Sequence, residues 1–293
     1  MDFTYPWMAA RALALGLDPY RFLAQVKLTF FYPAPAGLIA LPFAFLPVRF
    51  AASVFVGLGC GWLAIQLTRE HWWPLALFAS APILQACSAA QWAPLLTAAS
   101  LSAVSAGLTI AKPNLALPLL VYRWSRGESL RWAAIVAAIL CFITFIISPA
   151  WPLNWLSVVR NNPASSQYRI PVLMLTGAPI ALALLRWRRG DARLLFVLGC
   201  VPQNAFFYDQ LPLLLIPKNR LELIAATLVS QAALYAASLN APMASPEVWS
   251  RHFEPFMLVG MYLPALISVL RRPNETTVAL SGRTSGTANE TAL

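Results

Sequence analysis

Long runs without a charged residue alternate with short basic clusters along the chain. The charge-free runs cover 72–111, 132–159, 170–185, 223–246 and 255–270, and the longest of them contains 40 residues. A helix that crosses the hydrocarbon of a bilayer needs about 20 apolar residues. The longest run therefore has room for two crossings, or for one crossing and a re-entrant segment.

Three shorter apolar stretches add to these. Residues 50–67 predict a further crossing, 194–208 a short crossing and 210–217 a half-helix. No alternation with a period of two residues is present, so the pattern is typical of helices rather than of a barrel. We therefore predict an all-α fold, a polytopic transmembrane helical bundle with about eight to eleven membrane segments that include re-entrant or broken helices.

Composition supports this class. Of the 293 residues, 59% are hydrophobic and 11% are charged, and the mean hydropathy is +0.64. Soluble proteins carry about 25% charged residues, so the composition excludes a soluble enzyme. The net charge of +10 is concentrated in clusters between apolar runs, which is typical of membrane topology and gives no indication of a nucleic-acid partner.

The basic clusters predict the orientation in the membrane. They comprise Arg123, Arg126 and Arg131; Arg186, Arg188, Arg189 and Arg193; Lys218 and Arg220; and Arg271 and Arg272. Basic loops remain in the cytoplasm, so we expect these clusters and the C-terminus on the cytoplasmic side. The less basic loops 152–169 and 240–254 are then expected outside.

The N-terminal part differs from the rest. Residues 6–16 are predicted to form a short amphipathic helix in the membrane interface, with Met8, Ala12 and Leu15 on one face and Gly16 at its C-terminal cap. The apolar stretch 32–47 contains four prolines, which favour a broken or re-entrant element over a straight crossing.

We thus divide the chain into three regions. They are an outer loop at 1–47 with the interfacial helix and the proline-broken segment, a transmembrane bundle at 48–272, and a disordered cytoplasmic tail at 273–293 that is rich in Ser and Thr. The outer segments 1–34 and 150–169 are expected on the same face, where they would cover one cavity.

The N-terminal motifs resemble glycosyltransferase family 87. They are Asp2-Phe3, a short Ala/Leu helix, Gly-Leu-Asp-Pro-Tyr at 16–20, Phe-Tyr-Pro-Ala-Pro at 31–35 and Leu-Pro at 46–47. Ala-Gln-Trp-Ala-Pro-Leu-Leu at 90–96 stands where that family has Gly-Gln-x-Asn-x-Leu-Leu, and Ala-Lys-Pro-Asn at 111–114 matches its Lys-Pro. Two departures are Ala93 in place of the family's Asn, and the absence of the family's usual transmembrane helix before Asp2.

The resemblance implies a GT-C type integral membrane enzyme similar to the polyprenol-phosphate mannosyltransferases of mycobacteria. Such an enzyme moves a sugar, a hexose such as mannose, from a polyprenyl-phosphate donor to a lipid or glycan acceptor. The reaction takes place at the outer face of a bacterial plasma membrane. The resemblance makes Asp2 the general base that takes the acceptor proton. No cofactor is expected, and a divalent metal ion is not excluded.

Asp18 and Asp209 are alternative catalytic carboxylates. Asp18 precedes Pro19, and Asp in this position is also a common turn former. Asp209 lies between two apolar runs, where a carboxylate is equally suited to cap a broken helix.

Lys112 is the leading candidate for binding the donor phosphate. It is the one charged residue between His71 and Arg123, and a lysine inside a membrane segment is energetically expensive. The alternative is a side chain that snorkels from a helix end. Arg160 and Arg169 in the outer loop are further phosphate candidates, or else anchors at the interface.

Two polar residues within apolar surroundings, Gln91 and Tyr208, are candidates for lining the substrate cavity, although Gln91 is also suited to an interhelical hydrogen bond. No metal-ligand spacing is found. The four cysteines, Cys60, Cys87, Cys141 and Cys200, lie inside apolar stretches and are predicted to be small core residues.

Two other classes remain open. A secondary transporter also has proline-broken helices and a few intramembrane charges, but it usually has an internal repeat, which this chain lacks. A truncated, non-catalytic membrane subunit is the third possibility.

Overall fold

The computed structural model describes residues 1–161, 168–239, 241 and 246–274. Within these ranges the regular structure is helical, and the one β contact is an isolated antiparallel bridge between Arg169 and Gln203. The predicted all-α class is confirmed. The predicted tail lies outside the described residues from 275 onward.

Three helical stretches are long and apolar enough to cross a membrane: α4 (Val48–Leu67), α11 (Arg220–Leu239) and the stretch Val248–Leu270. The last of these runs through α12 (Pro246–Met257), a π-helical turn η8 (Leu258–Tyr262) and α13 (Leu263–Leu270). A fourth is obtained if α8 (Arg131–Ile147) and α9 (Trp151–Asn161), which meet at a bend of 98°, are counted as one span.

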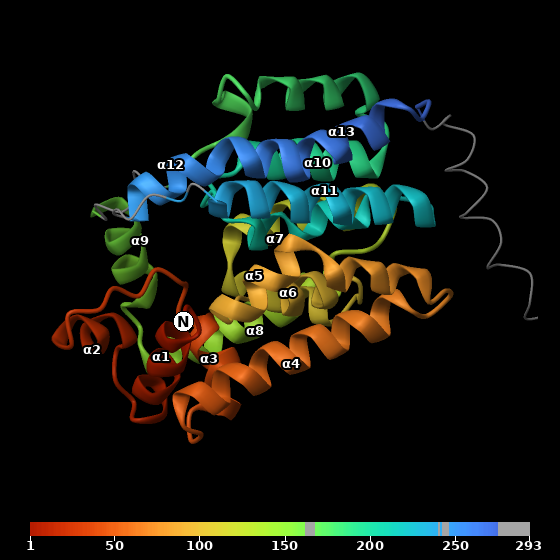
Figure 1. Cartoon of the computed structure of the whole chain (residues 1–293). Helices are drawn as coiled ribbons and strands as arrows, with labels where there is room; N and C mark the ends of the chain where they lie inside the picture. Colours follow the sequence, from red (N-terminus) through yellow and green to blue (C-terminus); the bar gives the residue numbers. More distant parts are fainter. Residues whose placement is uncertain (162–167, 240, 242–245, 275–293) are drawn as a thin grey trace, which may run out of the picture.

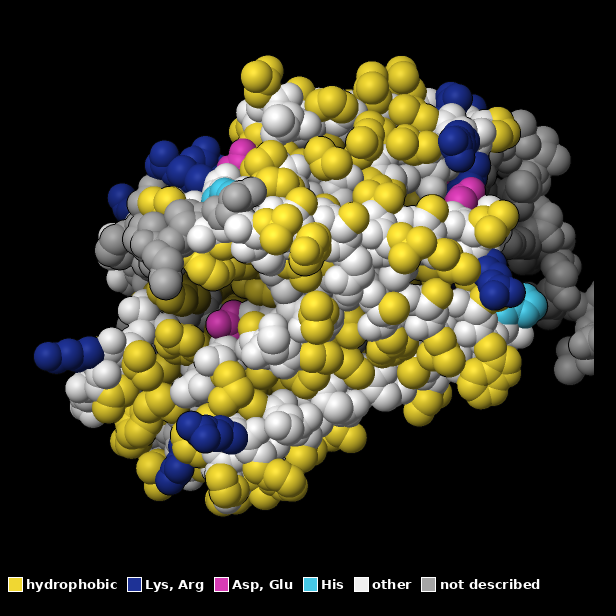
Figure 2. Space-filling model, viewed as in Figure 1, with side chains coloured by type: hydrophobic (Ala, Val, Ile, Leu, Met, Phe, Trp, Pro, Cys, Tyr) yellow, Lys and Arg dark blue, Asp and Glu magenta, His cyan; other side chains and the backbone are white. Residues whose placement is uncertain are grey.

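The outward faces of these helices are apolar. Ile65 in α4, Phe142 in α8 and Leu228 in α11 are all exposed, and Phe142 has 65% of its surface accessible. Figure 2 shows hydrophobic side chains over the middle of this face and basic side chains toward its two ends. Such a surface is stable in lipid and unfavourable in water, so the chain is an integral membrane protein.

The other apolar runs form shorter helices. These are the 3-10 helices η2 (Trp73–Ala79), η3 (Ser105–Ala111), η5 (Pro171–Leu173), η6 (Ala178–Arg186) and η7 (Phe207–Leu215), and the α-helices α5 (Ala81–Ala89), α6 (Ala93–Ser100), α7 (Pro113–Ser125) and α10 (Gly190–Cys200). Broken helices were predicted, but the run 72–111 contains four pieces instead of two crossings. Pro74, Pro82 and Pro94 each begin a new piece because proline fits the first turn of a helix and interrupts its interior. The number of membrane segments stays a prediction.

Figure 1 shows the helices in two layers, with α10, α11, α12 and α13 in one and α4, α5, α6 and α8 in the other. Helices α1 (Thr4–Ala14), α2 (Pro19–Gln25) and α9 lie together at one end of these layers. The end of α13 lies at the other end. The N-terminal helices and α9 are therefore neighbours in space although more than 100 residues separate them in sequence.

The predicted amphipathic helix is α1, which begins at Thr4 and ends before Gly16, whose φ of +68° fits the glycine cap that was expected. Its predicted face is only partly right, because Ala12 is fully buried and Met8 is half-buried. Leu15 is exposed, and the buried face contains Ala9 and Leu13. These two side chains pack against Gly37 of α3 (Pro35–Ala40), where a Cβ would lie 3.0 Å from Leu13 Cδ1. The helix thus packs part of its apolar surface against protein, and its position in the membrane interface stays a prediction. The broken segment continues through η1 (Leu41–Phe43).

The basic clusters come together at the end of the bundle where α13 stops. Asp191 in α10 is buried and forms ion pairs with Arg189 and Arg272, whose nitrogens lie 3.0 and 3.1 Å from its Oδ2. Arg272 also pairs with Glu222 of α11. Clusters from distant parts of the chain thus occupy one side of the bundle, as a shared topology requires.

The prediction for the cysteines is wrong. Cys87 is exposed and the other three are half-buried, so none of the four is a core residue. Cys60 of α4 and Cys87 of α5 lie beside each other, with 3.9 Å between the sulfur atoms. Thiols are small and apolar, so the outward faces of membrane helices accommodate them as readily as a core does.

Candidate functional site

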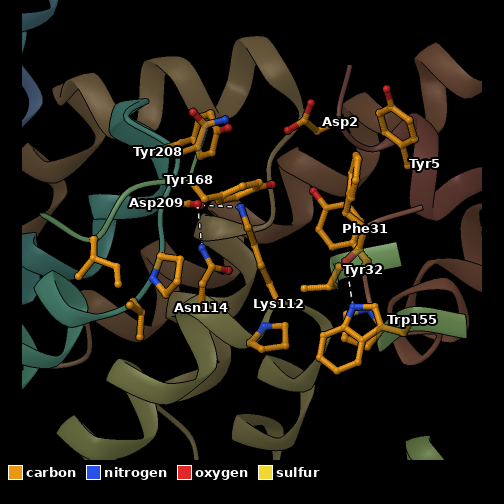
Figure 3. Close-up of a pocket in the computed structure, with 17 residues that line it drawn as sticks. Asp2, Tyr5, Phe31, Tyr32, Lys112, Asn114, Trp155, Tyr168, Tyr208 and Asp209 are labelled. Carbon is orange, nitrogen blue, oxygen red and sulfur yellow. Dashed lines mark hydrogen bonds and ion pairs between the residues drawn. The ribbon is translucent and has the colours of Figure 1, made fainter. Parts of the chain in front are cut away.

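A cavity of about 730 Å³ lies between the N-terminal segment, the start of α7, α9 and the start of η7. Its polar lining includes Asp2, Lys112, Asn114 and Asp209. In Figure 3 the side chains of Asp2, Lys112 and Asp209 point toward a common space. The structure thus brings together candidates from three distant parts of the sequence.

Lys112 occupies a break between η3 and α7. Its backbone, with φ −143° and ψ 89°, is not helical, and Pro113 begins the next helix directly after it. The Nζ of Lys112 donates to Asp209 Oδ1 over 2.6 Å, and Asn114 Nδ2 donates to Asp209 Oδ2 over 3.2 Å. Both carboxylate oxygens of Asp209 therefore have donors, which compensates for its burial at 1% exposure.

Gln91 connects this ion pair to Asp2. Its Oε1 accepts from Lys112 Nζ over 3.4 Å, and its Nε2 donates to Asp2 Oδ2. Gln91 follows Ala90, whose left-handed backbone (φ +53°) ends α5 and turns the chain toward the cavity. The backbone N–H of Asp2 donates to Ala89 O over 2.9 Å, so the terminal segment is fixed at the same turn. A continuous polar chain thus runs from Asp209 through Lys112 and Gln91 to Asp2.

Six aromatic side chains also line the cavity, namely Tyr5, Phe31, Tyr32, Trp155, Tyr168 and Tyr208. The Lys112 ammonium lies 5.1 Å from the centre of the Tyr208 ring, within the range of a cation–π contact. Trp155 Nε1 in α9 donates to Phe31 O over 3.0 Å. The segments 1–34 and 150–161 therefore line one cavity, as predicted, while 162–167 of the later loop lie outside the described residues.

The tyrosines of the outer loops remain protonated at neutral pH. Burial, and then repulsion from Asp2, raises the pKa of Tyr32 well above its usual value of 10.0. Partial burial of the Tyr168 ring, and then repulsion from Asp209 and Asp2, raises the pKa of this residue to about 12. These phenols are therefore hydrogen-bond donors and not bases, which leaves Asp2 and Asp209 as the proton acceptors of the cavity lining.

Asp18 lies outside this cavity lining and has a structural role. Its Oδ1 accepts from the backbone N–H groups of Tyr20 and Arg21, which caps α2. Its Oδ2 accepts from Ser148 Oγ over 2.6 Å and Asn154 Nδ2 over 3.0 Å. The turn role weighed for Asp18 in the sequence accounts for the two backbone contacts, whereas the contacts from Ser148 and Asn154 join α2 to the bend between α8 and α9.

The two outer-loop arginines are not among the residues that line the cavity. Arg160 is exposed near the end of α9. Arg169 forms the bridge to Gln203 and an ion pair with Glu254, with 3.7 Å between Nε and Oε2. Its neighbours Tyr168 and Ile170 do line the cavity, so the backbone at Arg169 passes the site while its own charge is paired elsewhere.

The residues of the site that were not singled out in the sequence include Asn114, Trp155 and Tyr168. Asn114 follows Lys112-Pro113, and a second polar residue beside an intramembrane lysine is a signal that could have identified it. Trp155 and Tyr168 gave no such signal, because aromatic residues near a predicted interface are typical of anchors. Only the fold brings these two rings to the cavity.

Within the described ranges no group of three or more His, Cys, Asp and Glu side chains is placed to hold a metal ion. The carboxylates of the cavity lining are those of Asp2 and Asp209.

No family model, no curated protein and no solved structure matches this chain. The functional assignment therefore depends on the residues of the cavity and on the motif resemblance within 2–114.

Proposed function

We propose that the protein is a membrane glycosyltransferase that moves a hexose from a polyprenyl-phosphate donor to a lipid or glycan acceptor at the outer membrane face. The observation that carries this proposal is the presence of a carboxylate, Asp2, and an ammonium, Lys112, in the lining of one cavity that also contains several aromatic rings. The transfer needs a base for the acceptor hydroxyl and positive charge for the departing phosphate.

Lys112 is suited to bind the donor phosphate. An ammonium group has three N–H donors, and two of them are directed to Asp209 and Gln91. The third is available for a phosphate oxygen. Asp209 holds the ammonium in position, and Asn114 in turn holds Asp209.

Asp2 is suited to act as the general base. One carboxylate oxygen, Oδ2, accepts from Gln91, and the other is available to the acceptor. In the proposed step the acceptor hydroxyl gives its proton to Asp2 while its oxygen forms a bond to the anomeric carbon of the sugar. The bond from that carbon to the phosphate oxygen breaks, and polyprenyl phosphate leaves with the electron pair.

The surroundings of the cavity suit a lipid-linked donor. Trp155 and Val159 of α9 line the cavity, and Leu153 and Leu156 of the same helix are exposed. An apolar helix face that leads from the molecular surface to the cavity provides a favourable path for a polyprenyl chain.

The experiment is a transfer assay on the protein in proteoliposomes that contain polyprenyl-phosphate [¹⁴C]mannose and a set of lipid and glycoside acceptors. We expect radioactive acceptor together with released polyprenyl phosphate. Lys112→Met is expected to abolish transfer, whereas the matched control Lys27→Met, at an exposed position of the first loop, retains it. No transfer from a panel of polyprenyl-phosphate hexoses, or an active Lys112→Met protein, would contradict the proposal.

One observation favours a second candidate, a secondary transporter. The cavity lining contains two carboxylates and one ammonium, and Lys112 already has a carboxylate partner. A buried Lys–Asp pair that exchanges partners is a recurrent device for coupling transport to protons. Proteoliposomes with an imposed pH gradient distinguish the two, because a transporter accumulates unmodified sugar inside the vesicles and a transferase yields a glycosylated product.

A further inference from the structure

A second, smaller recess adjoins the cavity. Its volume is about 280 Å³, and it lies between the C-terminal half of α5 and the segment that leads into η7. Asp2 and Tyr208 line both the recess and the cavity. The carboxylate proposed as the base therefore stands at the boundary between two separate spaces.

The polar groups of the recess are neutral apart from this carboxylate. Gln85, Ser88 and Gln91 line it, and no Lys, Arg or His is among its lining residues in the described part of the chain. The Oε1 of Gln85 accepts from the backbone N–H of Phe207 over 2.7 Å, which fixes the amide. Its Nε2 has no partner among the described residues and keeps both N–H donors. Ser88 Oγ donates to Gln85 O and keeps its acceptor capacity.

One wall of the recess is aromatic. The rings of Phe206 and Tyr208 stack with centroids 5.8 Å apart and planes inclined by 18°. A flat aromatic surface beside amide and hydroxyl groups is complementary to a sugar ring, which has C–H groups on its faces and hydroxyl groups around its edge. The same surface has no cation to offer an anionic group.

We propose that this recess binds a neutral sugar ring, the acceptor's terminal hexose, while the phosphate end of the donor occupies the larger cavity beside Lys112. This inference rests on the proposed glycosyl transfer. The two substrates then approach the Asp2 carboxylate from opposite sides. A hydroxyl of the acceptor ring meets the free oxygen of Asp2, and the anomeric carbon of the donor lies across the boundary.

In this proposal the charged phosphate and the neutral sugar ring bind in different spaces. The ammonium of Lys112 serves the cavity, and the Gln91 amide, which lies between Lys112 and Asp2, separates that positive charge from the recess. A neutral ring gains hydrogen bonds in the recess without losing charge-assisted contacts, whereas a sugar phosphate would face the Asp2 carboxylate without a counter-charge.

The experiment is a binding titration of the full-length protein in nanodiscs, followed by saturation-transfer NMR. The probes are methyl α-D-mannopyranoside, methyl α-D-glucopyranoside and, as an anionic comparison, mannose 1-phosphate. We expect saturable binding of at least one neutral glycoside. Phe206→Ala and Ser88→Val are each expected to weaken it by about tenfold, equivalent to about 1.4 kcal/mol.

Two matched controls separate these effects from general damage. Phe45→Ala removes a phenyl ring that is 85% exposed and lines neither space, and Ser53→Val changes an exposed serine of α4. Both are expected to bind as the parent does. Ser88 is exposed on α5, so its variant is expected to fold even if Phe206→Ala does not.

The inference is overturned if the parent shows no saturable glycoside binding, or if binding survives both Phe206→Ala and Ser88→Val. The glycosyl transfer itself fails separately. If the protein binds glycosides with the expected variant pattern but transfers no sugar from any polyprenyl-phosphate donor, the sugar-binding recess is supported and the transferase is refuted. Transfer with an unchanged acceptor KM in the Phe206→Ala and Ser88→Val variants would support the transferase and refute the sugar-binding role of the recess.

Discussion

Lys112 and Asp209 form a buried ion pair, with 2.6 Å between Nζ and Oδ1, across a sequence separation of 97 residues. Each of the two lies at an interruption in the helical structure, Lys112 ahead of α7 and Asp209 near the start of η7. Because either charge alone would be left without compensation inside the protein, the pair fastens two broken elements to each other.

We therefore expect Asp209→Leu to destabilise the protein, by up to about 3–5 kcal/mol, because it removes the carboxylate that compensates the charge of the half-buried Lys112 ammonium. The double variant Lys112→Met/Asp209→Leu removes both charges and is expected to recover most of that loss. Thermal unfolding in detergent of the parent, the two single variants and the double variant measures the coupling between the two side chains. Additive effects would mean that the pair does not contribute to stability.

Asp2→Asn is expected to lower turnover by at least about 10²–10⁴-fold, since the amide cannot take the acceptor proton. Donor binding is expected to persist, because Lys112 is unchanged. Single-turnover rates and equilibrium binding of the donor measure the two quantities separately. If Asp2→Asn stays active while Asp209→Asn is inactive, the base is Asp209 instead.

Gln91→Met is expected to lower kcat with little change in the KM of the donor. The side chain donates to Asp2 Oδ2 and accepts from Lys112, so its loss leaves the carboxylate without the contact that orients it. An interaction that acts only in the transition state affects kcat in this way. Gln25→Met, at an exposed position of α2, is the matched control. A rise in KM alone would show that Gln91 contributes to binding and not to orientation.

Asp18→Ala is expected to lower stability by about 0.5–2 kcal/mol through the lost cap of α2, and further through the lost contacts to Ser148 and Asn154. Turnover per folded molecule is expected to remain, because Asp18 is not among the residues that line the cavity. Thermal unfolding and activity corrected for the folded fraction test this pair of expectations. A complete loss of turnover in a stable Asp18→Ala protein would return Asp18 to the candidates for the base.

Hydrophobic pattern predicted the class of fold and some of its elements. The stretch 50–67 is free of proline and corresponds to α4 almost residue for residue. The run 72–111 is equally apolar, yet it is broken into four pieces. Its prolines indicate where the helices are interrupted. The position of Gln91, however, depends on the left-handed backbone of Ala90, which no sequence pattern predicts.

The candidate site was predictable in its charges and not in its contacts. Lys112 and Asp209 stood out because isolated charges in apolar runs are rare. Their pairing could not be inferred, because nothing in the local sequence indicates which distant element a membrane helix packs against. The same limit explains why the predicted face of α1 is only partly right, with Ala12 buried and Leu15 exposed. Leu15 has the helical spacing of a buried residue, but tertiary packing against Gly37 selects Ala9 and Leu13 instead.

The bend of 98° between α8 and α9 has a mechanical consequence. Ser148, in the bend, and Asn154, within α9, both donate to Asp18, the residue that caps α2. The Asp18 carboxylate thus links the start of α2 to the bend between α8 and α9. The hydrogen bond from Trp155 to Phe31 O is a second link between α9 and the N-terminal loop. We therefore expect a displacement of α9 at the cavity to carry α2 with it.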